Sequence, residues 1–312
     1  MVVRIADRWD VSRKIGSGSF GDVFAGEDVI TQEKVAIKRE LASAPYPLIK
    51  HEYGMYQEFV HVEGFPQIKY GGIEGPYHII VMERLGPTLK DLHFDSPGGR
   101  LPLRTVVYCA VQTLRRLRAL HDRGIVFRDV KSGQFCVGRA GDDISQSPTI
   151  YMIDFGLAKW FIDEAGKHVT GKKIDIKRSK TGTARYASLN VHRGLEHSRR
   201  DDLESLAYVL IELVQGRLPW SNLRAHNPGA GWKKALAMKE QAYISELVSG
   251  LPDAFRILLE YARGMKFTDT PDYDMLDKLF ADLYEKLSPR GPGEDGERPL
   301  VWEVEAPANG GW

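Results

Sequence analysis

The sequence predicts an α+β chain of two lobes, a small β-rich lobe with one helix and a larger helical lobe. Segments typical of strands dominate the first 85 residues, whereas apolar residues at three- and four-residue intervals dominate the remainder. With 312 residues, the chain is also too long for one small core. We therefore expect a first lobe over residues 1–85, a second lobe over 86–288 and a flexible tail rich in Pro and Gly over 289–312.

Charge and hydropathy exclude several classes of protein. The formal net charge is +1, so no field of the whole protein attracts nucleic acid, and no apolar stretch approaches the length of a membrane span. We expect neither nucleic-acid binding nor membrane insertion. The charge is nevertheless uneven, because residues 159–200 contain 11 Lys or Arg against 4 Asp or Glu. This segment predicts a local surface that attracts anions.

The cysteines and the N-terminus indicate the compartment. Cys109 and Cys136 lie in apolar stretches without the spacing of metal ligands, so we interpret them as reduced packing residues. Residues 1–10 contain no apolar signal core, and neither terminus carries a lipidation motif. The expected localisation is cytoplasmic, with the nucleus as a second location.

A glycine-rich hairpin is predicted near the N-terminus. Gly16, Gly18 and Gly21 follow a G-x-G-x-x-G pattern, which also opens a helix in dinucleotide-binding folds. Here residues 22–26 are too few and too β-prone for a helix, and Val35-Ala-Ile37 follows as a second strand. Without Cβ atoms, the glycines allow the backbone to approach phosphate groups closely.

One helix of the first lobe carries a carboxylate on its apolar face. Ile49, Glu52, Tyr56 and Phe59 recur at helical spacing, so Glu52 lies on the apolar stripe. A carboxylate that faces a core needs a cation, and Lys38 is the obvious partner. The alternative is that Glu52 flanks the stripe in water.

Two long helices are predicted in the second lobe. Apolar residues from Val107 to Leu120 form one face of a helix that should stop at Gly124. A second helix from Leu203 to Val214, apolar on nearly all sides, should end at Gly216 and form the centre of the lobe.

Four fragments in the order found in protein kinases predict a phosphoryl-transfer site. They are Gly16-Ser-Gly18-Ser-Phe-Gly21-Asp-Val23, Val35-Ala-Ile-Lys38, Phe127-Arg-Asp129-Val-Lys131-Ser-Gly-Gln134 and Asp154-Phe-Gly156. Lys38 would hold the α- and β-phosphates of ATP, and Asp154 would bind Mg²⁺. Asp129 would orient the substrate hydroxyl, and Lys131 would reach the γ-phosphate. Any one of these alone could be an ordinary surface charge.

The same pattern predicts a nucleotide pocket. Met82, Glu83 and Leu85 fall where an adenine would bond to the backbone, although an apolar strand end would look the same. The expected cofactors are ATP and Mg²⁺, for which Mn²⁺ can substitute. The predicted pocket residues are Ile15, Gly16, Ser17, Gly18, Ser19, Phe20, Gly21, Val23, Ala36, Lys38, Glu52, Met82, Glu83, Leu85, Cys136 and Ile153.

Further motifs resemble those of the casein kinase 1 family of Ser/Thr kinases, over about residues 5–287. They are Lys14-Ile-Gly-Ser-Gly-Ser-Phe-Gly-Asp22, Val81-Met-Glu83, Leu85-Gly-Pro87, Thr181-Gly-Thr-Ala-Arg-Tyr-Ala-Ser188 and Ser198-Arg-Arg-Asp-Asp-Leu-Glu-Ser205. As in that family, no Ala-Pro-Glu string follows Asp154. The resemblance implies a two-lobed protein kinase fold, with Asp202 bracing the catalytic loop and Thr183 contacting Asp129.

The resemblance also implies protein substrates with acidic or phosphorylated recognition sites. One anion-binding group would comprise Arg185, Gly216 and Arg224, and a second would comprise Arg128, Lys159 and Arg178. Charge-assisted hydrogen bonds from such cations suit phosphate and carboxylate groups. The alternative is that these cations form a solvated face.

The catalytic loop departs from the family pattern at Ser132-Gly133-Gln134, where the family has Pro, an acidic residue and Asn. We expect Gln134 to bind metal together with Asp154, but Gln is longer than Asn by a methylene and a torsion, so the ligand atom could be misplaced. Two functions therefore stay open. The first is a protein Ser/Thr kinase with reduced activity, and the second is a casein kinase 1-like pseudokinase that binds nucleotide or phosphoprotein as a scaffold.

The predicted tail differs from the regulatory tails that the resemblance implies. Residues 289–312 contain no Ser, Thr or Tyr, so they offer no hydroxyl for inhibitory phosphorylation. Alternating polarity predicts a short strand over residues 300–305.

Overall fold

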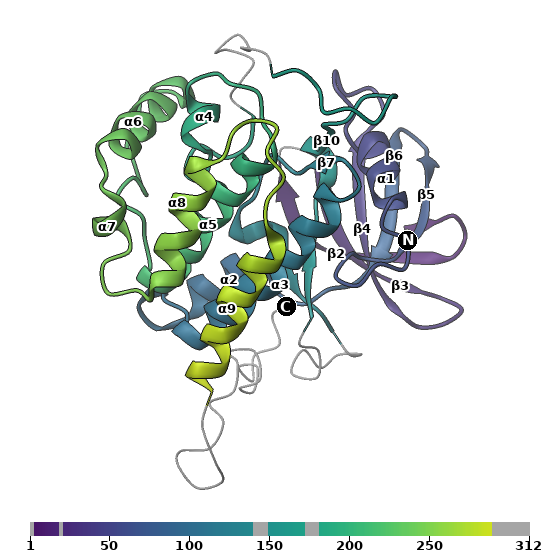
Figure 1. The fold of residues 1–312 in the computed structure, drawn as a ribbon. Coiled ribbons are helices and arrows are strands. Elements are labelled where there is room, and N and C mark those ends of the chain that lie inside the picture. The colour runs from purple at the N-terminus through teal and green to yellow at the C-terminus, as the bar shows by residue number, and fades with distance from the viewer. Residues whose placement is uncertain (1–2, 19–20, 140–148, 172–180, 289–312) are drawn as a thin grey trace, which may run out of the picture. The chain divides into compact units, whose positions relative to one another are not determined.

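The computed structural model describes residues 3–18, 21–139, 149–171 and 181–288 (Figure 1). The predicted tail and its short strand lie outside these ranges. The chain divides into two compact units. The first comprises the chain up to Pro87 together with Cys136–Leu157, and the second comprises Thr88–Phe135 together with the chain from Ala158.

A six-stranded antiparallel sheet forms most of the first unit, with the strand order β1-β2-β3-β4-β6-β5. Its strands are β1 (Arg4–Ile5), β2 (Trp9–Gly18), β3 (Gly21–Asp28), β4 (Lys34–Leu41), β5 (Ile68–Glu74) and β6 (Tyr77–Glu83). Strands β2 and β3 are the two arms of the predicted glycine-rich hairpin, and Val35–Ile37 lies in β4, as predicted. Because side chains alternate along β4, Val35 and Ile37 join an apolar cluster around Trp9, and Lys38 lies on the opposite face.

Helix α1 (Ile49–Gln57) is the one helix predicted for the first lobe. It packs against the short 3₁₀ turn η3 (Phe155–Leu157), where the ring of Phe155 lies 4.9 Å from that of Tyr56. Strands β8 (Phe135–Val137) and β9 (Ile150–Met152) form a two-stranded sheet that precedes this turn. The chain from β9 to η3 thus brings Asp154 next to α1.

The second unit is helical. Its helices are α2 (Leu89–Asp95), α3 (Leu103–His121), α4 (Leu189–His192), α5 (Arg199–Gln215), α6 (Pro228–Gln241), α7 (Ile244–Leu247), α8 (Asp253–Gly264) and α9 (Tyr273–Leu287). Its shorter elements are the 3₁₀ turns η1 (Pro97–Gly99) and η2 (Ser132–Gln134) and the antiparallel strands β7 (Ile125–Val126) and β10 (Lys159–Trp160). Figure 1 shows α5 in the centre of these helices, packed against α8, and α3 alongside α9.

The two long predicted helices are present. Helix α5 is buried on nearly every side and ends at Gly216, as predicted. Helix α3 ends at His121, so the prediction that it would continue to Gly124 was wrong by three residues. The backbone turns after Asp122, and Gly124, with φ of +77°, belongs to the turn that leads into β7. In the described part of the chain, no helix is both long enough and apolar enough to cross a membrane.

Candidate active site

Three charged side chains meet in the first unit. Lys38 Nζ on β4 lies 2.5 Å from Glu52 Oε2 on α1 and 2.8 Å from Asp154 Oδ1. Lys38 and Glu52 are 7% and 1% exposed, and the Asp154 side chain is 22% exposed. The predicted pairing of Lys38 with Glu52 is therefore present, and the alternative that Glu52 lies in water is wrong.

The protonation of this cluster depends on its burial. Burial alone would lower the pKa of the Lys38 ammonium, but the charges of Glu52 and Asp154 outweigh it and raise that pKa above its ordinary value. Lys38 therefore stays charged. Burial raises the pKa of Glu52 to about 7, against the opposing effect of Lys38. With all three groups ionised the cluster has a formal charge of −1, and its least buried member is Asp154.

Asp154 is held by α1 in a strained backbone conformation. Its φ is +69°, a region that costs a non-glycine residue about 1–3 kcal/mol. The backbone N–H of Asp154 donates to the hydroxyl of Tyr56 at 3.0 Å. Tyr56 was recognised in the sequence only as part of the apolar stripe. Its hydroxyl gives it a second role, which is to fix the conformation that presents the Asp154 carboxylate.

The predicted nucleotide residues lie on neighbouring strands. Directly opposite pairs are Gly16 with Val23, Val23 with Lys38, and Ala36 with Met82. Residues directly opposite each other on neighbouring strands lie on the same face of a sheet, and so do residues two apart on one strand. Gly16, Val23, Ala36 and Met82 therefore lie on the same face as Lys38.

The other predicted pocket residues are placed as follows. Ile15, Ser17 and Gly18 lie on β2, Cys136 is buried on β8, and Ile153 follows β9. Ser19 and Phe20 lie outside the described residues. At the end of β6, the carboxylate of Glu83 accepts from the backbone N–H of Gln67 at 2.9 Å, and the backbone N–H of Glu83 donates to the Gln67 oxygen at 3.0 Å, so neither group is left for a base. Leu85 follows, and within the described residues no hydrogen bond engages its N–H.

Gly21 is required by the fold as well as by the predicted pocket. Its φ is +116°, and a Cβ atom there would lie 2.3 Å from the backbone oxygen of Arg39 on β4. At Gly18, by contrast, a Cβ atom would meet nothing within 4 Å. The close approach of β4 therefore explains why residue 21 is glycine. At Gly18 no neighbouring atom of the described residues prevents a larger side chain.

The second unit contains the predicted catalytic loop around Asp129. Its carboxylate accepts from Lys131 Nζ at 2.6 Å through Oδ2 and from Thr183 Oγ1 at 2.8 Å through Oδ1. Asp129 is buried, so both oxygens have fixed directions. The contact between Thr183 and Asp129 that the family resemblance implies is present.

Asp202 on α5 binds the backbone of this loop, as the resemblance also implies. Its two carboxylate oxygens accept from the backbone N–H groups of Phe127 and Arg128 at 2.7 and 2.9 Å. Arg128 has a φ of +70°, which those two hydrogen bonds stabilise.

Gly182 was not recognised as a site residue in the sequence. Its φ is +87°, and a Cβ atom there would lie 2.6 Å from the backbone oxygen of Arg128 and 3.2 Å from Asp129 Oδ1. Only glycine allows the segment before Thr183 to approach the catalytic loop this closely.

Gln134 is buried in the 3₁₀ turn η2 that ends the loop. Its side-chain nitrogen lies 3.5 Å from Asp129 Oδ2, at the long limit of a hydrogen bond. The amide therefore turns its nitrogen toward Asp129.

Two members of the first predicted anion-binding group, Arg185 and Gly216, lie near the C-terminal end of α5. Arg185 pairs with Glu212 of α5 at 3.2 Å, and its side chain is 39% exposed. Gly216 follows Glu212 by one turn and caps the helix. Arg224 is exposed, and in the described part of the chain no carboxylate pairs with it. Arg100, absent from the prediction, also approaches this helix end, since a Cβ atom at Gly216 would lie 3.1 Å from its Cγ.

The second predicted group gathers around Glu196 and His197. Lys159 pairs with Glu196 at 2.7 Å, and Arg128 and Lys159 both act electrostatically on His197. Burial, and then the charge of Arg128, lower the pKa of His197 to about 3, so this imidazole stays neutral. Arg178, the third predicted member, lies outside the described residues.

The lowered pKa of His197 predicts a loss of stability in acid. The unfolded chain takes up a proton at His197 as the pH falls below about 6.5, whereas the folded chain does not, so stability falls with pH between about 6.5 and 3. One unit below the unfolded pKa the loss is about 1.4 kcal/mol. Glutamine does not titrate, so His197→Gln should not suffer this loss. In urea unfolding, the free energy of unfolding of His197→Gln minus that of wild type should therefore be about 1.4 kcal/mol larger at pH 5.5 than at pH 7.5. The same difference in unfolding free energy at both pH values would contradict the lowered pKa of His197.

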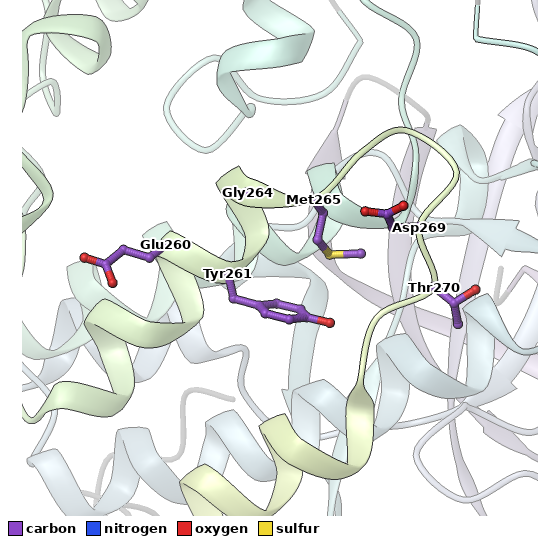
Figure 2. Close-up of a pocket in the computed structure, with 6 residues that line it drawn as sticks. All are labelled: Glu260, Tyr261, Gly264, Met265, Asp269 and Thr270. Carbon is purple, nitrogen blue, oxygen red and sulfur yellow. The ribbon is translucent and has the colours of Figure 1, made fainter.

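A surface hollow in the second unit has none of these residues in its lining. It measures about 460 Å³ and is lined by the end of α8 and the loop after it (Figure 2). Glu260 and Asp269 contribute two carboxylates to its lining, and carboxylates repel phosphate groups. This hollow therefore does not suit a nucleotide.

Two comparisons with known proteins agree with this geometry. The family model described as "Protein kinase domain" matches residues 9–249, so the chain belongs to the protein kinase family. The two-lobed fold class predicted from the sequence, with a β-rich N-terminal part and a helical C-terminal part, is thereby confirmed.

One similar protein is Casein kinase I homolog 2 of Schizosaccharomyces pombe. The two sequences are 39% identical over 287 residues, which is 92% of this chain and 64% of that protein. The resemblance to the casein kinase 1 family that the sequence motifs indicated is confirmed by this similarity. The chain spans less than two thirds of the length of that relative.

Proposed function

We propose that this protein transfers the γ-phosphate of ATP to serine or threonine hydroxyls of other proteins. The observation that carries the proposal is the buried cluster of Lys38, Glu52 and Asp154 in a chain of the kinase family. Lys38, neutralised in part by Glu52, holds the α- and β-phosphates. Asp129 orients the hydroxyl, and Lys131 holds the γ-phosphate.

The metal ion that the proposal includes is Mg²⁺, with Mn²⁺ as a substitute. The described residues contain no cluster of three His, Cys, Asp or Glu that could hold a metal by themselves. Proteins bind Mg²⁺ through one or two carboxylates together with substrate phosphates. The carboxylate of Asp154, the least buried member of an anionic cluster, and the amide oxygen of Gln134 are the oxygen ligands proposed for the ion. When bound, the ion neutralises charge on the phosphates.

A pseudokinase scaffold is the second candidate, and the catalytic loop favours it. Gln134 directs its nitrogen toward Asp129, and the proline of the family pattern is replaced by Ser132. A loop of this kind could hold nucleotide without efficient transfer.

The deciding experiment is transfer of labelled phosphate from ATP to casein in the presence of Mg²⁺. Lys38→Met is the control, because it removes the ammonium from the cluster and leaves Asp129 intact. We expect transfer well above the control. Transfer at the level of the control, with nucleotide binding retained, would establish the scaffold instead.

The proposed substrates carry acidic or phosphorylated residues near the target hydroxyl. The support is the half-exposed side chain of Arg185, which pairs with Glu212 near the end of α5, the exposed Arg224, and the second group of Arg128 and Lys159. In the first group Glu212 pairs with Arg185 and no carboxylate of the described residues pairs with Arg224, so positive charge remains there for an anion.

Reversing the charge of Arg185 should weaken the use of phosphorylated peptides selectively. Charge-assisted hydrogen bonds contribute about 1.5–3 kcal/mol each, so Arg185→Glu should raise KM for a phosphopeptide by about tenfold or more. The same peptide without its phosphate is the control substrate. Equal loss on both peptides would show general damage to the site and contradict this role.

The proposed localisation is the cytoplasm, with the nucleus as a second location. The free, buried thiols of Cys109 and Cys136 support a reducing compartment. Fractionation of cells that express a tagged protein tests this proposal.

A further inference from the structure

A buried lysine on helix α6 binds the main chain of the segment that carries Arg185. Lys239 is 0% exposed. Its Nζ donates to the backbone oxygens of Ala187 at 2.6 Å and of Ala184 at 3.0 Å. In the part of the chain that the structure describes, no carboxylate lies within ion-pair distance of this Nζ. The donors of Lys239 therefore serve two carbonyl groups on either side of Arg185.

Aromatic and imidazole rings complete the environment of Lys239. Its Nζ lies 4.7 Å from the ring centre of Tyr208 and 5.2 Å from that of Trp220. His192 Nε2 is 3.2 Å away, and burial, followed by the charge of Lys239, lowers the pKa of His192 to about 3. His192 is therefore neutral. Burial lowers the pKa of Lys239 to about 7, against the opposing effect of Glu204, but ammonium and amine both have enough N–H groups for the two carbonyls.

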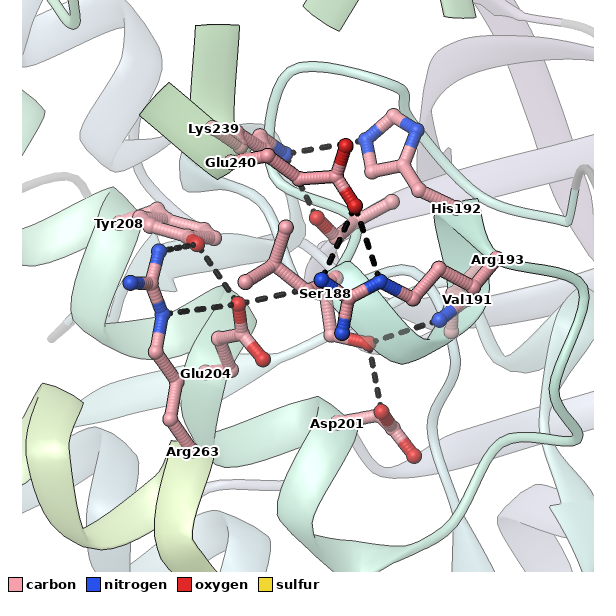
Figure 3. A network of polar contacts seen from close by, with 12 residues as sticks. Ser188, Val191, His192, Arg193, Asp201, Glu204, Tyr208, Lys239, Glu240 and Arg263 are labelled. Carbon is pink, nitrogen blue, oxygen red and sulfur yellow. Dashed lines mark hydrogen bonds and ion pairs between the residues drawn. The ribbon is translucent and has the colours of Figure 1, made fainter. Parts of the chain in front are cut away.

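The neighbouring residues hold the same segment. The indole N–H of Trp220 donates to the backbone oxygen of Arg185 at 2.7 Å. Glu204 accepts from the backbone N–H of Leu189 at 3.1 Å and pairs with Arg263 at 3.4 Å. Figure 3 shows Lys239 beside His192 and, on the other side of the network, Glu204 with Tyr208 and Arg263. Residues 184, 185 and 187 thus have their carbonyls bound by buried side chains that lie 35 to 55 residues later in the chain.

These contacts have a consequence for the Arg185 side chain. One end of the segment is fixed at the catalytic loop through Thr183, and the carbonyls after it are fixed by Lys239 and Trp220. The guanidinium of Arg185 pairs with Glu212 at 3.2 Å and lies 5.9 Å from the ring centre of Tyr186, and the Arg185 side chain is 39% exposed. The direction of Arg185 therefore depends on its backbone as well as on its own contacts.

We propose that Lys239 is a positioning residue for substrate, which fixes the backbone of residues 184–187 so that Arg185 meets the anionic group of a phosphorylated or acidic protein substrate. The expected effect on the KM for substrate rests on the proposed kinase function. The anchoring of the backbone of residues 184–187 rests on the geometry alone. The chain lacks the Ala-Pro-Glu string that follows Asp154 in most kinases, and Lys239 supplies an anchor for this segment from α6.

The test compares Lys239→Met with Lys233→Met. Methionine keeps most of the length of lysine and removes its N–H donors, and Lys233 is an exposed lysine on the same helix. For Lys239→Met we expect KM for a phosphopeptide to rise about tenfold, with kcat and the KM for ATP changed less than about twofold. Lys233→Met should match wild type in all three constants. Equal KM values for the two variants would overturn the proposal.

Amide hydrogen exchange gives a readout that needs no activity. The N–H groups of Tyr186 and Ala187 donate to the backbone oxygen of Thr183 at 2.9 and 3.0 Å, so they report on the opening of this segment. Lys239→Met should exchange faster at both amides than Lys233→Met and wild type. Unchanged exchange would overturn the proposal, even in an active enzyme. Absence of transfer in wild type, together with faster exchange in Lys239→Met, would instead contradict the proposed function and leave the anchoring role supported.

A second variant keeps the test decisive if Lys239→Met does not fold. Trp220→Phe retains an aromatic ring and removes the N–H that binds the Arg185 carbonyl, together with part of the volume of the indole. It should raise the phosphopeptide KM and the exchange of the same amides in the same direction, by a smaller factor. Thermal unfolding shows whether each variant is folded. A folded Trp220→Phe with wild-type KM and wild-type exchange would contradict the proposal.

Discussion

Replacing Asp129 with asparagine should lower kcat by about 10²- to 10⁴-fold and leave ATP affinity within about twofold of wild type. Asparagine preserves the shape of the side chain but replaces one acceptor oxygen with a donor. Both oxygens of Asp129 already accept, from Lys131 and from Thr183, so the new N–H₂ group must face one of these donors. The variant thus loses the charge that orients the hydroxyl and also one buried hydrogen bond.

The measurements are turnover at saturating ATP and peptide, and nucleotide affinity by direct binding. Thr183→Val is the matched control, since it removes the hydrogen bond to Asp129 Oδ1 without removing the carboxylate. Its loss should be much smaller than that of Asp129→Asn. Similar losses in the two variants would show that the geometry of the loop, and not the charge of Asp129, limits transfer.

The pairing of Lys38 with Glu52 in the first unit could be predicted from short stretches of sequence. A carboxylate at helical spacing on an apolar stripe requires a cation, and the strand that begins Val35-Ala-Ile37 offered one at Lys38. The structure places these two groups 2.5 Å apart. The end of α3 was less predictable, because Gly124 marks the turn before β7 and the last turn of the helix had already closed at His121.

The anchoring of the Arg185 segment could not be predicted from the sequence. Helix α6 carries Lys233, Lys234 and Lys239, which the sequence alone does not distinguish. Only the fold shows that Lys239 is buried. Its partners are backbone carbonyl groups, which every residue has, so no residue type in the sequence marks them. Gly182 is similar. Its need for glycine arises from the Arg128 oxygen, which is more than 50 residues away in the chain.

Gln134→Asn is expected to raise kcat by about tenfold to a hundredfold, which corresponds to about 1.4–2.8 kcal/mol in the transition state. Gln134 is buried and reaches toward Asp129 Oδ2 with its nitrogen at 3.5 Å. Asparagine is shorter by one methylene and one torsion, so its amide is held closer to the backbone of η2 and in fewer conformations. Nucleotide affinity should stay similar, because Lys38 and Asp154 hold ATP in the ground state. The second metal site matters most as charge develops during transfer.

Adding Ser132→Pro should increase the gain further. Ser132 is the first residue of η2, where proline is tolerated, and Lys131 before it is extended, with φ of −154° and ψ of 159°. Proline would fix the start of the turn that carries residue 134. Turnover of wild type, Gln134→Asn and the double variant should be compared across titrations of Mg²⁺ and Mn²⁺, with nucleotide affinity measured separately. A wild type as fast as Gln134→Asn at every metal concentration would show that glutamine already serves as the ligand, because its longer side chain would then cost nothing in the transition state.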